Sequence, residues 1–182
     1  LKPVYRWGLD TSFLRLHYDC QSNEERRRLA GTIILFLIGA NGGLTLLLLG
    51  LAPTINGALF GGQNHVTTLS LLFANGFIGS FIFLPLIRLQ IQEKSRTYAT
   101  LTFVRSLGTI VLRLVFVVGL RWNVTGIVLA DVMISTLMVA GLSRSINTMT
   151  TWRFSRSVAR KMLQFGLPRA SQGILHQGMA MS

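Results

Sequence analysis

The stretch that decides the fold contains two apolar segments, LAGTIILFLIGANGGLTLLLLGLA (29–52) and TTLSLLFANGFIGSFIFLPLI (67–87). From Leu29 to Ile87 there is no Asp, Glu, Lys or Arg, and His65 is the only ionisable side chain. Each segment is long enough to cross about 30 Å of hydrocarbon at roughly 1.5 Å per residue. Pro, Gly, Asn and Gln residues gather between them, at 53–66, and predict a turn. The stretch therefore predicts a transmembrane helical hairpin.

The composition fits an integral membrane protein rather than a soluble domain. The mean hydropathy is +0.50, and 13% of the residues are charged. The formal net charge of +12 could suggest nucleic-acid binding, but Lys and Arg stand in short segments between apolar ones. That distribution is the positive-inside pattern of membrane proteins rather than a basic binding face. We therefore expect no nucleic-acid partner.

Signatures of catalysis, metal binding and cofactor binding are missing from the sequence. The single cysteine, Cys20, excludes an internal disulfide and gives no metal-binding pattern. There is no HExxH, no GxSxG, no Gly-rich phosphate loop and no pair of carboxylates within an apolar segment. We therefore expect a protein that is not an enzyme and that has no catalytic residue, metal site or cofactor.

Apolar and polar segments alternate along the whole chain. Residues 1–22 are predicted to form a cytoplasmic segment with an amphipathic helix, and 144–163 a cytoplasmic linker. Residues 164–182 begin a further transmembrane helix that is cut off, and the chain starts without Met, so we expect a fragment of a longer all-α protein. Between these ends, residues 23–143 are predicted to hold four transmembrane helices, at about 29–52, 67–87, 98–120 and 124–142.

Helix signals occur in both polar segments. Ser22 and Glu25 have the spacing of a capping box, which predicts that a helix begins at Asn23. A helix in 1–22, with Leu9, Phe13 and Leu16 on its apolar face, is predicted to lie on a membrane surface; the alternative for its start is the frayed end of an earlier span. A second helix, capped by Ser155 and with Val158, Met162 and Phe165 on its apolar face, is predicted to lie on an anionic inner leaflet; the alternative is a solvated linker.

The topology follows from the distribution of Lys and Arg. The segments 1–28, 88–98 and 144–163 hold six, three and five of these residues. The intervening segments 53–66 and 121–123 hold none and one. Because alternate segments are basic, the positive-inside rule places the first set in the cytoplasm and the second set outside.

Charged residues inside the apolar segments are the leading functional candidates, since a charge at the bilayer centre costs about 3 kcal/mol on insertion scales. Arg113 and Asp131 are equidistant from Trp122, the predicted turn, so we expect them to lie at equal depth on adjacent helices. They form either an ion pair that only stabilises the hairpin, or a part of the lining of a cavity. Arg105 has no carboxylate at matching depth, which falls near Val139, and we expect it to face a cavity that admits an anion such as phosphate. The alternative is that Arg105 snorkels to the cytoplasmic interface.

Polar and small residues within the apolar segments complete the set of candidates. In the cut-off segment, Arg, Gln and His are spaced i, i+3, i+7 and so form one stripe, which is typical of a water-filled path, although a lone His is more often simply buried. Gly39 and Gly43 have the spacing that lets helix backbones approach closely, so we interpret them as packing positions. The polar candidates for the lining of a cavity are Arg169, Gln172, His176, Asn41 and Asn75.

Three stretches, in this order, resemble the polysaccharide and oligosaccharide lipid flippases of the multidrug/oligosaccharidyl-lipid/polysaccharide exporter superfamily. That group includes O-antigen flippases and lipopolysaccharide biosynthesis membrane proteins. GLDTSFLRLHYDCQSNEERRR (8–28) is similar to the family's cytoplasmic segment between the second and third spans. LPLIRLQIQEKSRTYATLTFVRSLGTIVLRLVFVV (84–118) is similar to its fourth-to-fifth span region, and FSRSVARKMLQFGLP (154–168) to the cytoplasmic helix before its seventh span. The chain departs from the family at His17, where an aromatic residue is common, and at Arg169, where an apolar residue is usual.

The resemblance implies a fold, a function and partners. The full protein would have two six-helix lobes around a central cavity and would work by alternating access. It would move a polyprenyl-diphosphate-linked oligosaccharide across the bacterial cytoplasmic membrane for O-antigen, capsule or exopolysaccharide synthesis. Its partners would be that lipid-linked oligosaccharide and membrane lipids, with glycan assembly proteins as further candidates. A multidrug cation antiporter of the same superfamily, which would want acidic cavity residues, and a membrane-embedded glycan polymerase or ligase are the alternative functions.

Overall fold

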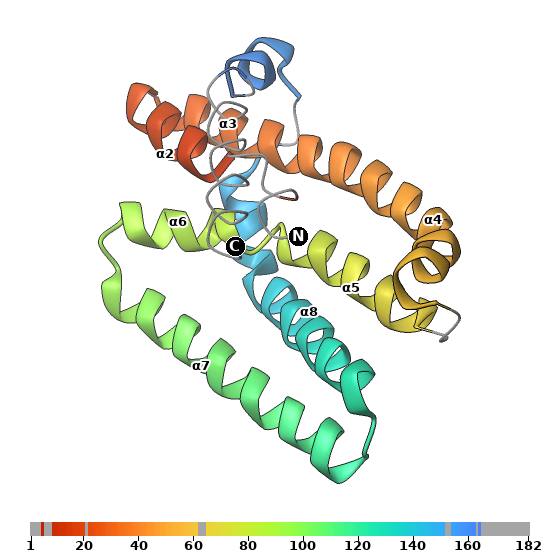
Figure 1. Cartoon of the computed structure of the whole chain (residues 1–182). Helices are drawn as coiled ribbons and strands as arrows, with labels where there is room; N and C mark the ends of the chain where they lie inside the picture. Colours follow the sequence, from red (N-terminus) through yellow and green to blue (C-terminus); the bar gives the residue numbers. More distant parts are fainter. Residues whose placement is uncertain are drawn as a thin grey trace, which may run out of the picture.

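The protein is all-α in the computed structural model, which describes residues 5, 9–20, 22–61, 65–151, 154–162 and 164. Four helical stretches in this part of the chain are long and apolar enough to cross a membrane. In Figure 1 the first of them forms one long rod, and the last lies between the second and the third. These stretches are Asn23–Phe60, Val66–Ile91, Ser95–Gly119 and Asn123–Met149.

The first membrane helix is longer than the sequence predicts. It consists of α3 (Asn23–Phe36), the π-helix η1 (Leu37–Asn41) and α4 (Gly42–Phe60). The start at Asn23 is confirmed, because the Ser22 side chain accepts a hydrogen bond from the Glu25 backbone N–H.

The prediction that a loop begins at Pro53 is wrong, because α4 continues through this residue for two further helical turns. Gly61 ends the helix instead, in the left-handed conformation (φ 54°) that glycine adopts without steric cost.

The second membrane helix is broken near its middle. It consists of α5 (Val66–Gly79) and α6 (Phe83–Ile91), separated by a turn at 80–82. Pro85 explains the break, because its ring would clash with the carbonyl of residue 81 in a continuous helix. Ser80 is buried in the turn and donates its hydroxyl hydrogen to the Phe77 carbonyl oxygen at 2.6 Å.

The third and fourth membrane helices form an antiparallel hairpin. It consists of α7 (Ser95–Leu114), the π-helix η2 (Val115–Gly119) and α8 (Asn123–Met149). The Phe116 and Trp122 rings stack at 5.6 Å, and the Trp122 N–H donates to the Phe116 carbonyl oxygen at 3.0 Å. Gly126 lies against both of these side chains, which leaves little space for a larger residue. Trp122 therefore marks the turn, as predicted.

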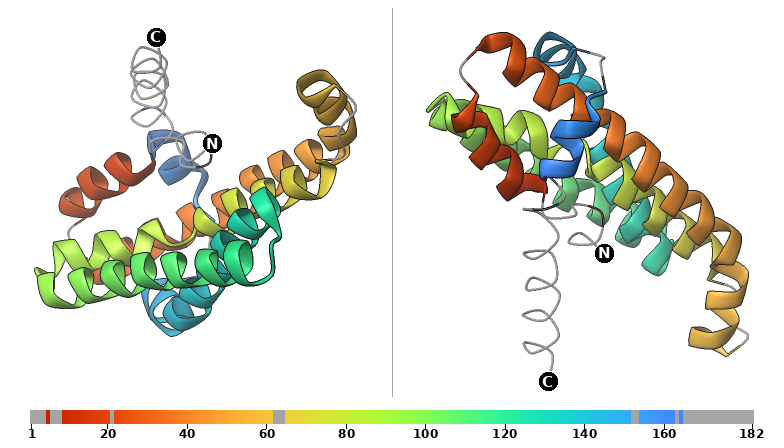
Figure 2. Two further views of the ribbon diagram at one scale, coloured as in Figure 1. Left: turned by 60° about the horizontal axis from the view of Figure 1, so that its bottom comes forward. Right: turned by 90° about the horizontal axis from the view of Figure 1, so that it is seen from above.

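The amphipathic helix α2 (Leu9–Asp19) packs on the protein rather than on a membrane surface. Its Leu9 and Phe13 are fully buried in the main apolar cluster, between α3 and α6. Met162, from the helical residues 156–162, is buried in the same cluster, and its carbonyl oxygen accepts a hydrogen bond from Ser12. Figure 2 shows 156–162 beside α2 and across α3. The predicted apolar residues Leu9, Phe13, Val158 and Met162 therefore pack on the helix bundle instead of a membrane, while Phe165 lies outside the residues that the structure describes.

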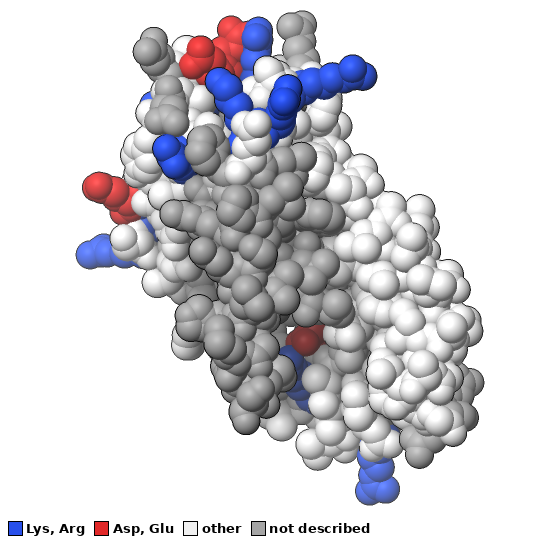
Figure 3. Space-filling model, turned by 45° about the horizontal axis from the view of Figure 1, so that its top comes forward, with Lys and Arg blue, Asp and Glu red and all other residues white. Residues whose placement is uncertain are grey.

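Basic side chains gather at one end of the molecule. In Figure 3, Lys and Arg crowd the end that carries α2 and the start of α3, while the surface beyond is nearly uncharged. This is the pattern that the positive-inside rule predicts for the cytoplasmic end of a membrane protein.

Cysteine labelling of the full-length protein tests this orientation. With Cys20 replaced by serine, a cysteine at the exposed position Leu59 should react with a membrane-impermeant thiol reagent in intact cells. A cysteine at Ser95 should react only after permeabilisation. Reaction at 95 but not at 59 in intact cells would contradict the predicted topology.

The close helix contacts occur at other glycines than predicted. A Cβ added at Gly39 or Gly43 would meet nothing within 4 Å among the described residues, so the packing interpretation of this pair is not confirmed. A Cβ at Gly31 would instead collide with the backbone carbonyl of Thr151, where the chain after α8 crosses α3. That crossing is held by a hydrogen bond from the Thr151 N–H to the Arg27 carbonyl oxygen at 3.1 Å.

Gly31→Ala should therefore destabilise the protein by about 1–3 kcal/mol, the usual cost of overpacking against a backbone that has to move. The measurement is the thermal unfolding midpoint of the full-length protein in detergent, which should fall. Gly39→Ala is the matched control, because it adds the same methyl group to the same membrane helix in open space. Equal midpoints for the two variants would show that the crossing at Gly31 is loose.

Candidate functional site

An ion pair joins the two helices of the α7–α8 hairpin. Nη2 of Arg113 lies 2.9 Å from each carboxylate oxygen of Asp131, and Nε lies 3.2 Å from Oδ1. The guanidinium thus uses two of its nitrogens on one carboxylate, a geometry that is stronger and more directional than a single contact. The pairing predicted from equal distances to Trp122 is confirmed. The two side chains remain 45% and 29% exposed, so part of the pair is accessible from outside the described bundle.

Asp131 belongs to a face of α8 that is turned into the bundle. Asp131, Ser135, Met138 and Leu142 follow one another at spacings of four and three residues, so they lie on one side of the helix. Met138 and Leu142 pack against Ile82. The arrangement therefore places the carboxylate at the edge of a packed helix interface.

Asn75 is used within the same interface. Its side-chain oxygen accepts a hydrogen bond from the Ser135 hydroxyl at 2.8 Å, which joins α5 to α8. Nearby, the hydroxyls of Thr68 and Thr125 are 2.8 Å apart and join the same two helices. Asn41, the second predicted asparagine, is fully buried and donates to the Tyr5 carbonyl oxygen at 2.7 Å. Within the described part of the chain, both asparagines thus hold segments together.

Arg105 lies on the side of α7 that faces α8. The less exposed positions of α7 recur every three or four residues, and Gly108 among them lies against the Ile134 side chain of α8. One turn from Arg105, Leu101 packs in one cluster with Met138 and Val139. Val139 is the position on α8 that the sequence predicts at the depth of Arg105. Arg105 is itself half-buried and has a partner within the chain, so the expectation of an unpaired arginine is wrong.

A polar stripe on α7 escaped the sequence reasoning. Thr102, Ser106, Thr109 and Arg113 are spaced i, i+4, i+7, i+11, and so fall within an arc of roughly 60°. The stripe borders the α8-facing side and ends at the ion pair. Phe103, Leu107 and other large apolar residues are exposed on the opposite side of α7. Thr102 and Thr109 satisfy their hydroxyls on carbonyl oxygens four residues back. The helical spacing of hydroxyl residues is the signal that would have found this stripe.

The remaining predicted site residues, Arg169, Gln172 and His176, lie outside the residues that the structure describes. Among those that it describes, no group of three His, Cys, Asp or Glu side chains is placed to hold a metal ion. The candidate site is therefore a membrane-embedded hairpin that carries an arginine–aspartate pair, a second arginine two turns away and a polar stripe. Such a hairpin can bind and position an anionic group, because its guanidinium groups carry fixed charge and several donors.

Comparison with known proteins identifies a family. A family model described as polysaccharide biosynthesis protein matches residues 7–181, nearly the whole chain. No curated protein and no solved structure matches the chain.

Proposed function

The chain belongs to the polysaccharide biosynthesis protein family, and from that premise we propose that it moves a polyprenyl-diphosphate-linked oligosaccharide across the bacterial cytoplasmic membrane. A multi-pass membrane protein of this family has a role in polysaccharide synthesis or export. The finer proposal is a flippase, which carries lipid-linked units for O-antigen, capsule or exopolysaccharide from the inner to the outer leaflet. It is not an enzyme in this proposal, and glycan assembly proteins would act on its substrate before and after transport.

One observation supports this proposal most directly. Arg105 lies within a membrane helix, on the side that faces the bundle, and Arg113 on the same helix is paired with Asp131. A guanidinium in an apolar span is costly and is usually kept where it meets a polar cavity or an anionic group. A diphosphate offers several oxygens to the planar fork of donors, whereas a neutral sugar would not require a cation.

The alternative functions receive less support. A cation antiporter would need an acidic residue available to its substrate, but both carboxylate oxygens of Asp131 are engaged by Arg113. A glycan polymerase or ligase would need a catalytic loop outside the membrane. The connections between α4 and α5, at 61–65, and between η2 and α8, at 120–122, are short. Transport of an anionic lipid-linked substrate is therefore the better match to the described residues.

Depletion of the full-length protein in its native host tests the proposal. Lipid-linked oligosaccharide should accumulate and stay on the inner leaflet, where externally added glycosidase in spheroplasts does not reach it. Re-expression should restore access without changing the length of the oligosaccharide. Accumulation of single units on the outer leaflet would contradict transport and would favour a polymerase or ligase.

A further inference from the structure

A second cluster of cationic side chains lies at the basic end of the bundle and includes neither of the α7 arginines. A cavity of about 540 Å³ opens where α2, the start of α3 and the ends of α6 and α8 meet. Its lining includes His17, Arg26, Arg27 and Arg88, together with the apolar Phe13 and Ile91. A volume in this range is typical of pockets that hold a small ligand.

No carboxylate balances the charge of this cavity among the lining residues that the structure describes, because none of them is Asp or Glu. Among the described residues, Arg26, Arg27 and Arg88 form no ion pair with a carboxylate. Three guanidinium groups in one cavity repel one another, and a bound anion would remove that repulsion.

Two buried nitrogen atoms of the cavity residues also lack partners. Nε of Arg26 and Nδ1 of His17 are buried and make no hydrogen bond within the described part of the chain. Burial and the nearby charges of Arg26 and Arg88 lower the pKa of His17, so its ring is neutral at pH 7. Buried polar atoms without a partner are uncommon in proteins, and an unfilled ligand position is one explanation for them.

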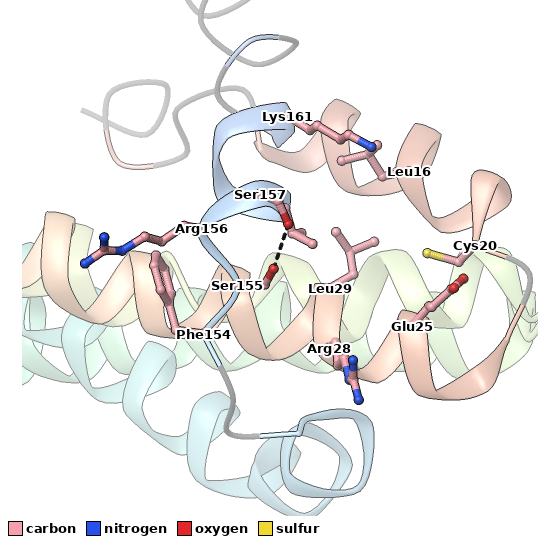
Figure 4. A pocket seen from close by; sticks show the side chains of 11 residues that line it. Leu16, Cys20, Glu25, Arg28, Leu29, Phe154, Ser155, Arg156, Ser157 and Lys161 are labelled. Carbon is pink, nitrogen blue, oxygen red and sulfur yellow. Dashed lines mark hydrogen bonds between the residues drawn. The ribbon is translucent and has the colours of Figure 1, made fainter.

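The larger cavity at the same end is less suited to an anion. It has a volume of about 780 Å³ and lies between α3 and 156–162. Figure 4 shows Arg156 directed away from its centre, and Arg28 is paired with Glu24 at 2.6 Å. Glu25 also lines this cavity. The cationic residues of the larger cavity, which also include Lys161, are therefore partly balanced by carboxylates, whereas no described Asp or Glu lines the smaller cavity.

From these observations we propose that the cavity lined by Arg26, Arg27 and Arg88 binds the phosphate group of a membrane lipid. Arg26 and Arg27 precede the apolar part of α3, and Arg88 follows the apolar part of the second span, so the cavity lies at the expected level of lipid headgroups. Its apolar residues Phe13 and Ile91 suit the glycerol or first isoprene carbons next to the phosphate. Phosphate-bearing ligands also occur in solution, and the experiment below separates the two sources. The proposal does not require that the protein transports the lipid that it binds here.

Lipid binding to the purified full-length protein tests the proposal. Wild-type protein is placed in nanodiscs of phosphatidylcholine with or without phosphatidylglycerol, which carries one anionic phosphate. Phosphatidylglycerol should raise the thermal unfolding midpoint, and native mass spectrometry should detect the retained lipid. Inorganic pyrophosphate in phosphatidylcholine nanodiscs is the soluble arm.

The double variant Arg26→Gln/Arg88→Gln should lose at least about tenfold in phosphatidylglycerol affinity, since hydrogen bonds to charged groups contribute about 1.5–3 kcal/mol each. Arg156→Gln/Arg160→Gln is the matched control, which removes two positive charges at the same end without touching the cavity, and it should behave as wild type. If the Gln double variant does not fold, Arg26→Lys/Arg88→Lys keeps the charge and should weaken binding less than tenfold but measurably, because the forked donors are lost.

Three results would overturn the proposal. Unchanged phosphatidylglycerol retention in the double variant, or in the Lys variant where that is the one that folds, would show that the cavity does not bind the lipid. Equal losses in the Arg26/Arg88 variant and in Arg156→Gln/Arg160→Gln would reduce the effect to net charge. Stabilisation by pyrophosphate but not by phosphatidylglycerol would assign the cavity to a soluble anion. None of these readouts depends on glycan transport, so a failure here leaves the proposed function intact, and the reverse also holds.

Discussion

Replacing Arg105 with alanine in the full-length protein is expected to abolish most glycan export while leaving the protein in the membrane. Arg105 lies half-buried on the α8-facing side of α7, inside a membrane span. In the proposed function its guanidinium contacts the diphosphate of the substrate, and one such charged contact contributes about 1.5–3 kcal/mol, or roughly 10- to 100-fold in rate. Insertion should not suffer, because alanine removes a charge from the apolar span.

Arg105→Lys separates charge from geometry. Lysine keeps the positive charge but presents a single point charge instead of a planar fork, so export should fall to an intermediate level. The measurement is surface glycan relative to membrane abundance of each variant. Ser106→Ala is the control, since it changes the neighbouring polar position of α7 without altering charge. Wild-type export by Arg105→Ala at normal abundance would remove Arg105 from the substrate path.

The Arg113–Asp131 pair is expected to control membrane abundance rather than transport alone. Arg113→Ala and Asp131→Ala each leave one charge without its bidentate partner in an apolar span, at a cost of about 3 kcal/mol on insertion scales. Both single variants should therefore accumulate to a small fraction of the wild-type level. The exchange Arg113→Asp/Asp131→Arg should recover most of that loss, because the two side chains meet across the same pair of helices.

Quantitative membrane blots of the two single variants and the exchanged pair measure this effect. Recovery of abundance without recovery of export would mean that the pair also has a role in the transport path. Normal abundance of both single variants would show that the pair contributes little to assembly.

Much of the architecture could be predicted because a bilayer demands simple sequence features. The absence of charge from 29 to 87 and the alternation of basic segments predicted the number of apolar helices. Equal distances from Trp122 predicted the pairing of Arg113 with Asp131, since antiparallel helices share a register about their turn. These inferences depend only on the lengths of the apolar segments and on the number of residues between a charge and the turn, which can be read directly from the sequence.

Other features depend on what a residue packs against, and the sequence does not state that. Proline has two outcomes here, because α4 passes through Pro53 while the second span breaks before Pro85. The apolar face of α2 was predicted, but periodicity does not distinguish a membrane from a protein surface. Likewise, the spacing of Gly39 and Gly43 predicted a close contact that the structure places at Gly31.

The chain after α8 crosses α3 and is hydrogen-bonded to it, so that the two segments are mechanically coupled. Besides the Thr151–Arg27 bond, the Ser155 N–H donates to the Thr32 hydroxyl at 3.3 Å, and that hydroxyl donates to the Arg28 carbonyl oxygen at 2.8 Å. A force applied to the segment at 154–162 is therefore transmitted to the start of the first membrane helix. Slippage would break two hydrogen bonds, one to a backbone carbonyl and one to a side-chain hydroxyl, each of about 1 kcal/mol, and would remove Met162 from the buried cluster. Movement of the segment at 154–162 is therefore expected to move the start of α3 with it.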